Sequence, residues 1–253
     1  MTKKNLLIGL SAMAVLLIIG SYWIGFLNPD SFPHPEELVK EINHHLPQAE
    51  AKIIQDTIKI EDRRVFVPFI SEKNKYGVSL WIWKGNDWEI AAVNTRGEPR
   101  SWQLENEDSP TTYIMWNISP DLPIKKIKLF LKKDRSFHIT EGVEYYDPGI
   151  QMEKTFELGN TSYGVMSLPD EWTSILESYM ALEETRQPDI YSSNFFIEHY
   201  MYLGWIAYDE SDLVLPPQND LVGGGFSSGN EYITHVRLLD PLEIETYEYP
   251  VLY

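Results

Sequence analysis

The chain has 253 residues, no cysteine and a formal net charge of −17 at pH 7, which arises from 38 acidic and 21 basic side chains. Such a charge repels phosphate backbones, whose binding depends on Lys and Arg releasing counterions, so we exclude a nucleic-acid partner. Without cysteine no disulfide stabilises the fold, and the 8 Trp, 15 Tyr and 10 Phe must supply much of the core.

The first predicted element is a membrane-spanning helix. The segment Leu6–Leu27 contains no charged side chain, and a helix of that length covers about 33 Å, enough to cross a hydrocarbon core of about 30 Å. Lys3 and Lys4 precede the segment and Asp30 follows it, so the N-terminus is expected in the cytoplasm and the rest of the chain outside. Residues 1–27 are therefore predicted to be a cytoplasmic tip and a signal-anchor helix.

A cleaved signal peptide is the alternative interpretation of this segment. Ala12-Met13-Ala14 matches the small-x-small cleavage pattern, but it lies in the middle of the run, and the run exceeds the usual apolar region of about 7–15 residues. A retained anchor is therefore favoured. A bacterial lipid anchor is excluded because it requires a cysteine. An exported domain of this size without cysteine is typical of the Gram-positive bacterial envelope, where we expect the protein to lie.

The body is predicted to begin after a short linker at 28–35, whose prolines discourage continuation of the first helix. Residues 36–118 are predicted to form an α+β domain, because Leu38, Val39, Ile42 and Leu46 have helical spacing and the pattern then changes to the period of two of strands. The expected strands lie at 54–60, 65–69, 77–83, 88–93, around residue 102 and at 113–118. A hairpin through Lys84-Gly85-Asn86-Asp87 is the strongest local signal.

Residues 119–253 are predicted to form a second β-rich domain with one helix, although one mixed body is the alternative. Two prolines, Pro120 and Pro123, mark the boundary. The expected elements are a strand at 125–132 that turns at 133–135 into 137–140, a hairpin of 153–158 with 163–167, a helix from 170 to about 186, and strands at 200–208 and 235–239. The predicted fold class is thus α+β: an N-terminal transmembrane helix followed by a mainly antiparallel β-rich ectodomain with two amphipathic helices.

Tryptophans provide the candidate ligand-binding residues. Trp81 and Trp83 project from the same side of one predicted strand and Trp88 lies across the hairpin, so the three indoles are placed to form a platform for a sugar or a peptide. Leu80 and Ile82 occupy the opposite side. This favours the competing interpretation, in which both sides of the strand are covered and the tryptophans belong to the core.

A weak catalytic candidate is Ser227, because Gly225-Phe-Ser-Ser-Gly229 matches the G-x-S-x-G motif of a nucleophile elbow. An elbow requires a helix after the serine, whereas residues 231–236 alternate like a strand. Too few residues follow to supply an acid and a histidine in the order of that fold.

Three further patterns were weighed as sites. His34, His44 and His45 lack the spacing that places two imidazoles on one helix face, and Asp209, Glu210 and Asp212 lack the spaced acids and the glycine of a calcium loop. We therefore predict no metal site and no cofactor. The sequences that start at Asn117 and Asn160 fit the N-x-S/T glycosylation pattern, which matters only in a host that glycosylates such sites.

These features predict a single-pass, membrane-anchored, extracytoplasmic protein that acts by binding, as a component of cell-envelope assembly or sensing. Its expected partners are the membrane, through Leu6–Leu27, and an envelope protein or glycan. No catalytic activity is evident from the sequence. The alternative is a membrane-tethered hydrolase that acts on envelope material through acidic residues or Ser227.

Overall fold

The computed structural model describes residues 13–15, 29–104, 111–159, 161–186, 201–216, 223–229 and 231–245. Within these ranges the protein is rich in β-strands, which pair mostly antiparallel, and has few helices, so the α+β class is confirmed at this level. No helix of the described ranges is long and apolar enough to cross a membrane. Apart from residues 13–15, the predicted span Leu6–Leu27 lies outside them.

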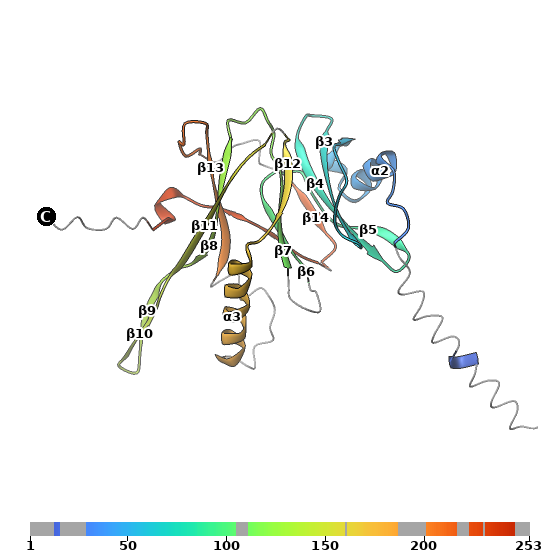
Figure 1. The fold of residues 1–253 in the computed structure, drawn as a ribbon. Helices are drawn as coiled ribbons and strands as arrows, with labels where there is room; N and C mark the ends of the chain where they lie inside the picture. The colour runs from blue at the N-terminus through green and yellow to red at the C-terminus, as the bar shows by residue number, and fades with distance from the viewer. Residues whose placement is uncertain are drawn as a thin grey trace, which may run out of the picture.

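Most of the described elements are labelled in Figure 1. In chain order they are α2 (Pro35–His45), η1 (Pro47–Ala49), β1 (Ala51–Ile54), β2 (Ile58–Glu61), β3 (Arg64–Ser71), β4 (Tyr76–Lys84), β5 (Asp87–Asn94), β6 (Arg100–Leu104), β7 (Thr111–Asn117), β8 (Lys126–Lys133), β9 (Ser136–Thr140), β10 (Val143–Asp147), β11 (Ile150–Glu157), β12 (Tyr163–Ser167), α3 (Asp170–Arg186), β13 (Tyr202–Tyr208), β14 (Gly225–Ser227), β15 (Tyr232–His235), β16 (Arg237–Leu238) and η4 (Pro241–Glu243).

Three sheets and α2 are stacked in layers, which Figure 1 shows from right to left. The first sheet has the order β1-β3-β4-β5-β14, with β2 also paired to β3; the second has the order β12-β7-β6-β15 and the third β11-β8-β13-β16. Apolar side chains fill the space between each pair of layers. The antiparallel β4–β5 hairpin is confirmed, and Gly85 in its turn has a φ of 68°, a conformation that favours glycine.

Helix α2 covers the outer face of the first sheet. It begins at Pro35, which is suited to the first helical turn because its missing N–H would have no partner there, and Glu37 accepts a hydrogen bond from the His34 amide. Leu38 and Ile42 are fully buried against side chains of β3, β4 and β5. Each such side chain stabilises the fold by about 1.5–3 kcal/mol, which attaches the helix to the sheet.

Between the first and second sheets the core contains the large side chains Phe66, Leu80 and Trp102, all fully buried. A polar contact joins the same two sheets at Asn117, whose side chain is 0% exposed. Its Nδ2 lies 2.7 Å from the Gly77 carbonyl oxygen, and its Oδ1 accepts a hydrogen bond of 2.9 Å from the Ser162 hydroxyl. Because buried amides are costly when unpaired, these contacts fix how the sheets meet.

The third sheet and α3 enclose a further core. Leu129 of β8 and Trp205 of β13 pack there with Trp172 and Tyr179 of α3. The predicted helix is confirmed with its bounds, and Asp170 and Glu171 in its first turn suit the positive end of the helix dipole. The side chains from residue 180 onward in α3 lie outside the described part of the structure.

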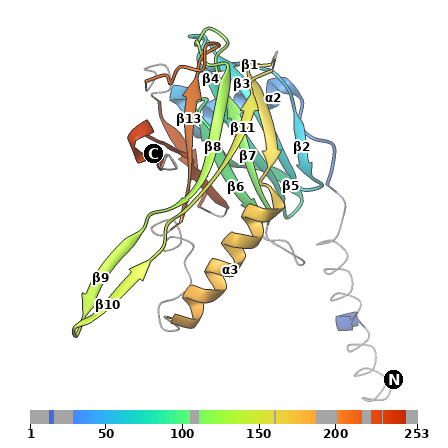
Figure 2. The ribbon, with the colours of Figure 1, turned by 60° about the vertical axis from the view of Figure 1, so that its left-hand side comes forward.

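Two predicted connections are wrong. The chain does not reverse at residues 133–135, because β8 ends at Lys133 and pairs with β11, whereas β9 pairs with β10; the reversal comes at Glu141 and Gly142, both with positive φ. The resulting β9–β10 ribbon extends away from the body beside α3 (Figure 2). Strands predicted at 153–158 and 163–167 are present, the first as residues 150–157, but they do not form a hairpin, because β11 pairs with β8 and β12 with β7.

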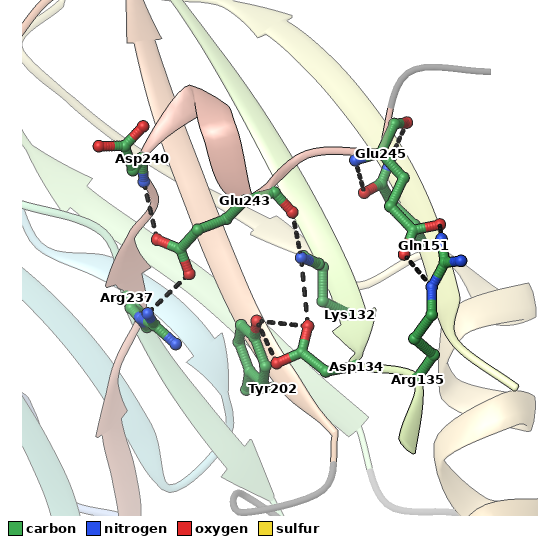
Figure 3. A network of polar contacts seen from close by, with 9 residues as sticks. All are labelled: Lys132, Asp134, Arg135, Gln151, Tyr202, Arg237, Asp240, Glu243 and Glu245. Carbon is green, nitrogen blue, oxygen red and sulfur yellow. Dashed lines mark hydrogen bonds and ion pairs between the residues drawn. The ribbon is translucent and has the colours of Figure 1, made fainter. Parts of the chain in front are cut away.

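A polar network attaches the segment after β16 to the third sheet (Figure 3). Lys132 of β8 donates to the Glu243 carbonyl oxygen and pairs with Asp134. Gln151 and Glu245 exchange two hydrogen bonds of 2.9 and 3.0 Å. The segment therefore covers the outer face of the third sheet, where Leu239 packs in a small apolar cluster.

The predicted boundary at residue 119 stays a prediction. Strands on its two sides share sheets: β12, β14 and β15 follow it, and they pair with β7, β5 and β6, which precede it.

Candidate functional site

The three candidate tryptophans have different environments. Trp81 is 1% exposed and Trp83 is 7% exposed, so both belong to the core, as the competing interpretation of the sequence has it. Trp88 is partly exposed at the start of β5, directly opposite Trp83. Of the three candidate tryptophans, only Trp88 is therefore accessible to a ligand.

Trp88 lines a pocket of about 370 Å³, which lies where the linker meets the edge of the first sheet. Its volume is within the range of small-molecule sites. The pocket is lined by Pro29, Asp30, Phe32, Thr57, Lys59, Asp62, Val65 and Trp88.

The linker holds the Trp88 ring in place. Phe32 meets Trp88 edge to face with a centroid distance of 4.8 Å, and it meets Trp81 in the same way at 5.8 Å. The Trp88 indole N–H donates a 3.1 Å hydrogen bond to the Asp30 carbonyl oxygen. Edge-to-face pairs are worth about 0.5–1.5 kcal/mol beyond burial, so the ring is fixed before any ligand arrives.

The polar side of the pocket comes from β2 and the turn that follows it. Lys59 Nζ lies 2.7 Å from Asp62 Oδ1, and both side chains are largely exposed. The hydrogen bond from Lys59, with its positive charge, lowers the pKa of the Asp62 carboxyl below its ordinary value. Trp88 thus lines the pocket together with Lys59, Asp62 and Thr57, whose side chains carry an ammonium, a carboxylate and a hydroxyl group. This combination is suited to a polar molecule with an apolar face.

Sequence reasoning identified Trp88 but missed the residues around it. Phe32 lies in the segment assigned as a linker, and Lys59 and Asp62 lie in and beside a turn, where charged residues are usual. The pair Lys59 and Asp62, three residues apart on either side of a predicted strand end, carried no signal of a pocket. Phe32 reaches Trp88 from the linker, whereas Lys59 and Asp62 reach the pocket through the pairing of β2 with β3.

Ser227 lies at the exposed end of β14, opposite Ala92 of β5. Its hydroxyl accepts a 3.3 Å hydrogen bond from the Gly229 amide. The next described element is the strand β15, so no strand-to-helix elbow is formed there. Among the described residues, no hydrogen bond joins Ser227 to a histidine.

Residues of the histidine and acidic patterns that were considered as metal ligands make contacts within the fold. His45 contacts the Glu41 carbonyl oxygen at 3.0 Å and the Phe226 ring, while Asp209 accepts hydrogen bonds from the amides of Ser211 and Leu213 in a turn. No group of three or more His, Asp or Glu in the described ranges is placed to hold a metal ion.

Of the two asparagines in glycosylation patterns, the structure describes only Asn117. Asn117 is buried and hydrogen-bonded, so in the folded protein its side chain is inaccessible to modification. Asn160 lies outside the described residues.

Comparison of the chain with models of protein families, with curated proteins and with solved structures found no match.

Proposed function

We propose that this protein is anchored in the cell membrane by Leu6–Leu27, with its body outside, and that it binds an envelope glycan through the Trp88 pocket. One observation carries the proposal: three of the residues that line the pocket, Pro29, Asp30 and Phe32, directly follow the predicted anchor. Pro29, the first lining residue, comes two residues after Leu27.

This spacing limits where the pocket lies. An extended chain covers at most about 3.6 Å per residue, so Pro29 is within about 7 Å of the end of the anchor. The polar layer of a bilayer extends about 5–8 Å beyond its hydrocarbon core. In the anchored protein the pocket therefore opens beside the outer membrane surface, within reach of molecules attached there.

The chemistry of the lining favours a sugar over a lipid headgroup. A sugar ring presents C–H groups to an aromatic face and hydroxyls to donors and acceptors, which Trp88, Lys59 and Asp62 supply. An anionic headgroup would instead meet Asp30, Asp62 and a chain of net charge −17. Repulsion from this charge disfavours it.

Calorimetry on the full-length protein in detergent, with the N-acetylglucosamine tetramer as probe, tests the pocket. Wild type is expected to bind saturably, and Trp88→Ala is expected to weaken binding at least tenfold because the stacking surface is lost. Asp62→Asn, whose side chain is 85% exposed and outside the core, should weaken binding several-fold without changing stability.

Tyr232→Ala provides the matched control, because it removes an exposed aromatic ring on β15 that does not line the pocket. Binding that is equal in wild type and in Trp88→Ala would contradict the proposal. So would a loss in the Tyr232→Ala control as large as that in Trp88→Ala.

The absence of cysteine allows a clean test of orientation. A single cysteine replaces Ser211, which is exposed, or Thr2, and a membrane-impermeant maleimide is added to intact cells. Ser211→Cys should react on intact cells and Thr2→Cys only after lysis. The reverse pattern would place the body in the cytoplasm and refute the anchored arrangement, whatever the pocket binds.

A further inference from the structure

A second cavity lies at the edge of the interface between the first and second sheets, separate from the Trp88 pocket. Its volume is about 180 Å³. An enclosed cavity of about 150 Å³ accommodates benzene, so this space suits a small organic molecule. The lining residues are Val78, Leu80, Ala92, Val93, Asn94, Arg100, Gly225, Phe226, Ser227 and Ile233.

Most of this lining is apolar, but it includes one cation. The Arg100 side chain is only 15% exposed, and its Nε is buried and has no hydrogen-bond acceptor among the described residues. Arginine cannot lose its proton at physiological pH, so an unpaired buried N–H of this group is costly. Burial lowers the pKa of Arg100 below its ordinary value, although Glu98, its one ionic partner among the described residues, acts in the opposite direction.

The surroundings leave excess positive charge at this position. One oxygen of the buried Glu98 lies 3.3 Å from Arg100 Nη2, 3.3 Å from Arg96 Nη1 and 3.2 Å from His235 Nδ1. Two guanidinium groups thus share one carboxylate. In a chain of net charge −17 this is a local cationic site, and an anion that enters the cavity would pair with it.

We propose that this cavity binds a small monocarboxylate, whose carboxylate pairs with Arg100 and whose short apolar chain lies against Val78, Leu80, Ala92 and Ile233, which belong to the core between the first and second sheets. The planar guanidinium fork matches a carboxylate through two parallel hydrogen bonds. Apolar walls exclude highly charged ligands, and the acidic surface of the protein repels polyanions. Ser227, which lies opposite Ala92 on β14, then serves as a hydroxyl at the cavity wall.

Hexanoate is a suitable probe, and hexan-1-ol is its neutral counterpart with the same chain. Full-length protein labelled with ¹⁵N-arginine in detergent is titrated with each at physiological ionic strength, and the Nε resonances of arginine are followed by NMR. Hexanoate should shift the Arg100 Nε resonance saturably, whereas hexan-1-ol should bind at least tenfold more weakly. This comparison uses wild type alone, so it does not depend on the folding of a variant.

Two variants distinguish direct contact between hexanoate and Arg100 from a general attraction of hexanoate to positive charge. Arg100→Lys keeps the charge but removes the fork, and it should weaken hexanoate binding at least tenfold. Arg96→Gln removes one of the two guanidinium groups that share Glu98 but does not line the cavity, so it should also weaken binding, by less than Arg100→Lys does. Equal binding of hexanoate and hexan-1-ol would overturn the proposal. So would wild-type affinity in Arg100→Lys, or no saturable shift of the Arg100 resonance.

Discussion

Two hairpins of this protein are rich in aromatic and β-branched residues, but they have opposite environments. In the β4–β5 hairpin Trp81 and Trp83 are buried, whereas in the β9–β10 ribbon Phe137 is 59% and Tyr146 65% exposed. The β4–β5 hairpin lies between α2 and the second sheet, while β9 and β10 pair only with each other among the described strands. Burial of these residues is therefore decided by which distant segments cover them, and not by their local pattern.

The largest expected effect comes from removing an aromatic ring in the covered hairpin. Trp81→Ala should lower the free energy of unfolding by about 3–5 kcal/mol, because it leaves a cavity between α2 and the sheet. The matched change in the ribbon, Tyr146→Ala, should alter it by less than about 0.5 kcal/mol. Urea denaturation of the full-length protein in detergent, followed by circular dichroism, measures both. Similar losses in the two variants would show that the ribbon is covered in solution.

The next effect concerns the contact that joins the two sheets around the hairpin. Asn117→Ala removes the donor that lies 2.7 Å from the Gly77 carbonyl oxygen and 3.1 Å from that of Phe69, and leaves both acceptors buried. We expect a loss of about 2–4 kcal/mol in the same denaturation experiment. Asn86→Ala, in the exposed turn of the hairpin, is the control and should change stability by less than about 0.5 kcal/mol. A small effect of Asn117→Ala would mean that water replaces the amide and that the sheets meet less tightly.

Local signals in the sequence predicted what local interactions decide. Alternation placed Trp81 and Leu80 on opposite faces, and the structure buries them in different cores. The turn at Gly85 and the start of α3 at Asp170 depend on residues within a few positions, so they too were predictable. The pairing of β11 with β8, in contrast, is not indicated by any local sequence pattern.

The candidate sites were less predictable than the strands, for a related reason. Trp88 stood out by its residue type, but its pocket depends on Phe32 crossing the hairpin from the linker. Arg100 gave no signal at all, because a single arginine in a strand usually reaches solvent. Its burial follows from the pairing of β6 with β15 and the packing of this sheet on the first one.

Each of the two hairpins has a glycine with positive φ in its turn. Gly85 and Gly142 have φ values of 68° and 81°, and a Cβ at either would meet open space, so replacement by alanine costs only the backbone strain of about 1–2 kcal/mol. In Gly85→Ala this strain should lower the free energy of global unfolding, since the β4–β5 hairpin unfolds together with the body. In Gly142→Ala it should instead accelerate amide exchange of residues 137–146 by about fivefold or more, with global stability unchanged, because an uncovered ribbon opens locally. Hydrogen exchange with mass spectrometry distinguishes local opening from global unfolding. A lower free energy of global unfolding in Gly142→Ala would show that the ribbon unfolds together with the core.

The smallest effect at neutral pH is expected where the ribbon leaves the third sheet. The Tyr202 hydroxyl donates to Asp134, which lies between β8 and β9, at 3.2 Å, as Figure 3 shows. Burial, and then the charge of Asp134, raise the pKa of Tyr202 to about 12. An unfolded tyrosine has a pKa of about 10, so the contribution of Tyr202 to stability is complete below pH 10 and is lost as the pH rises from about 10 to 12. Tyr202→Phe should therefore flatten the fall in stability over that interval and remove a step near pH 12 from the absorbance titration at 295 nm, while Tyr232→Phe on β15 should leave that step in place. A Tyr202 that titrates near pH 10 in the folded protein would mean that the Asp134 contact is open in solution, and that the ribbon is free at its base as well as along its length.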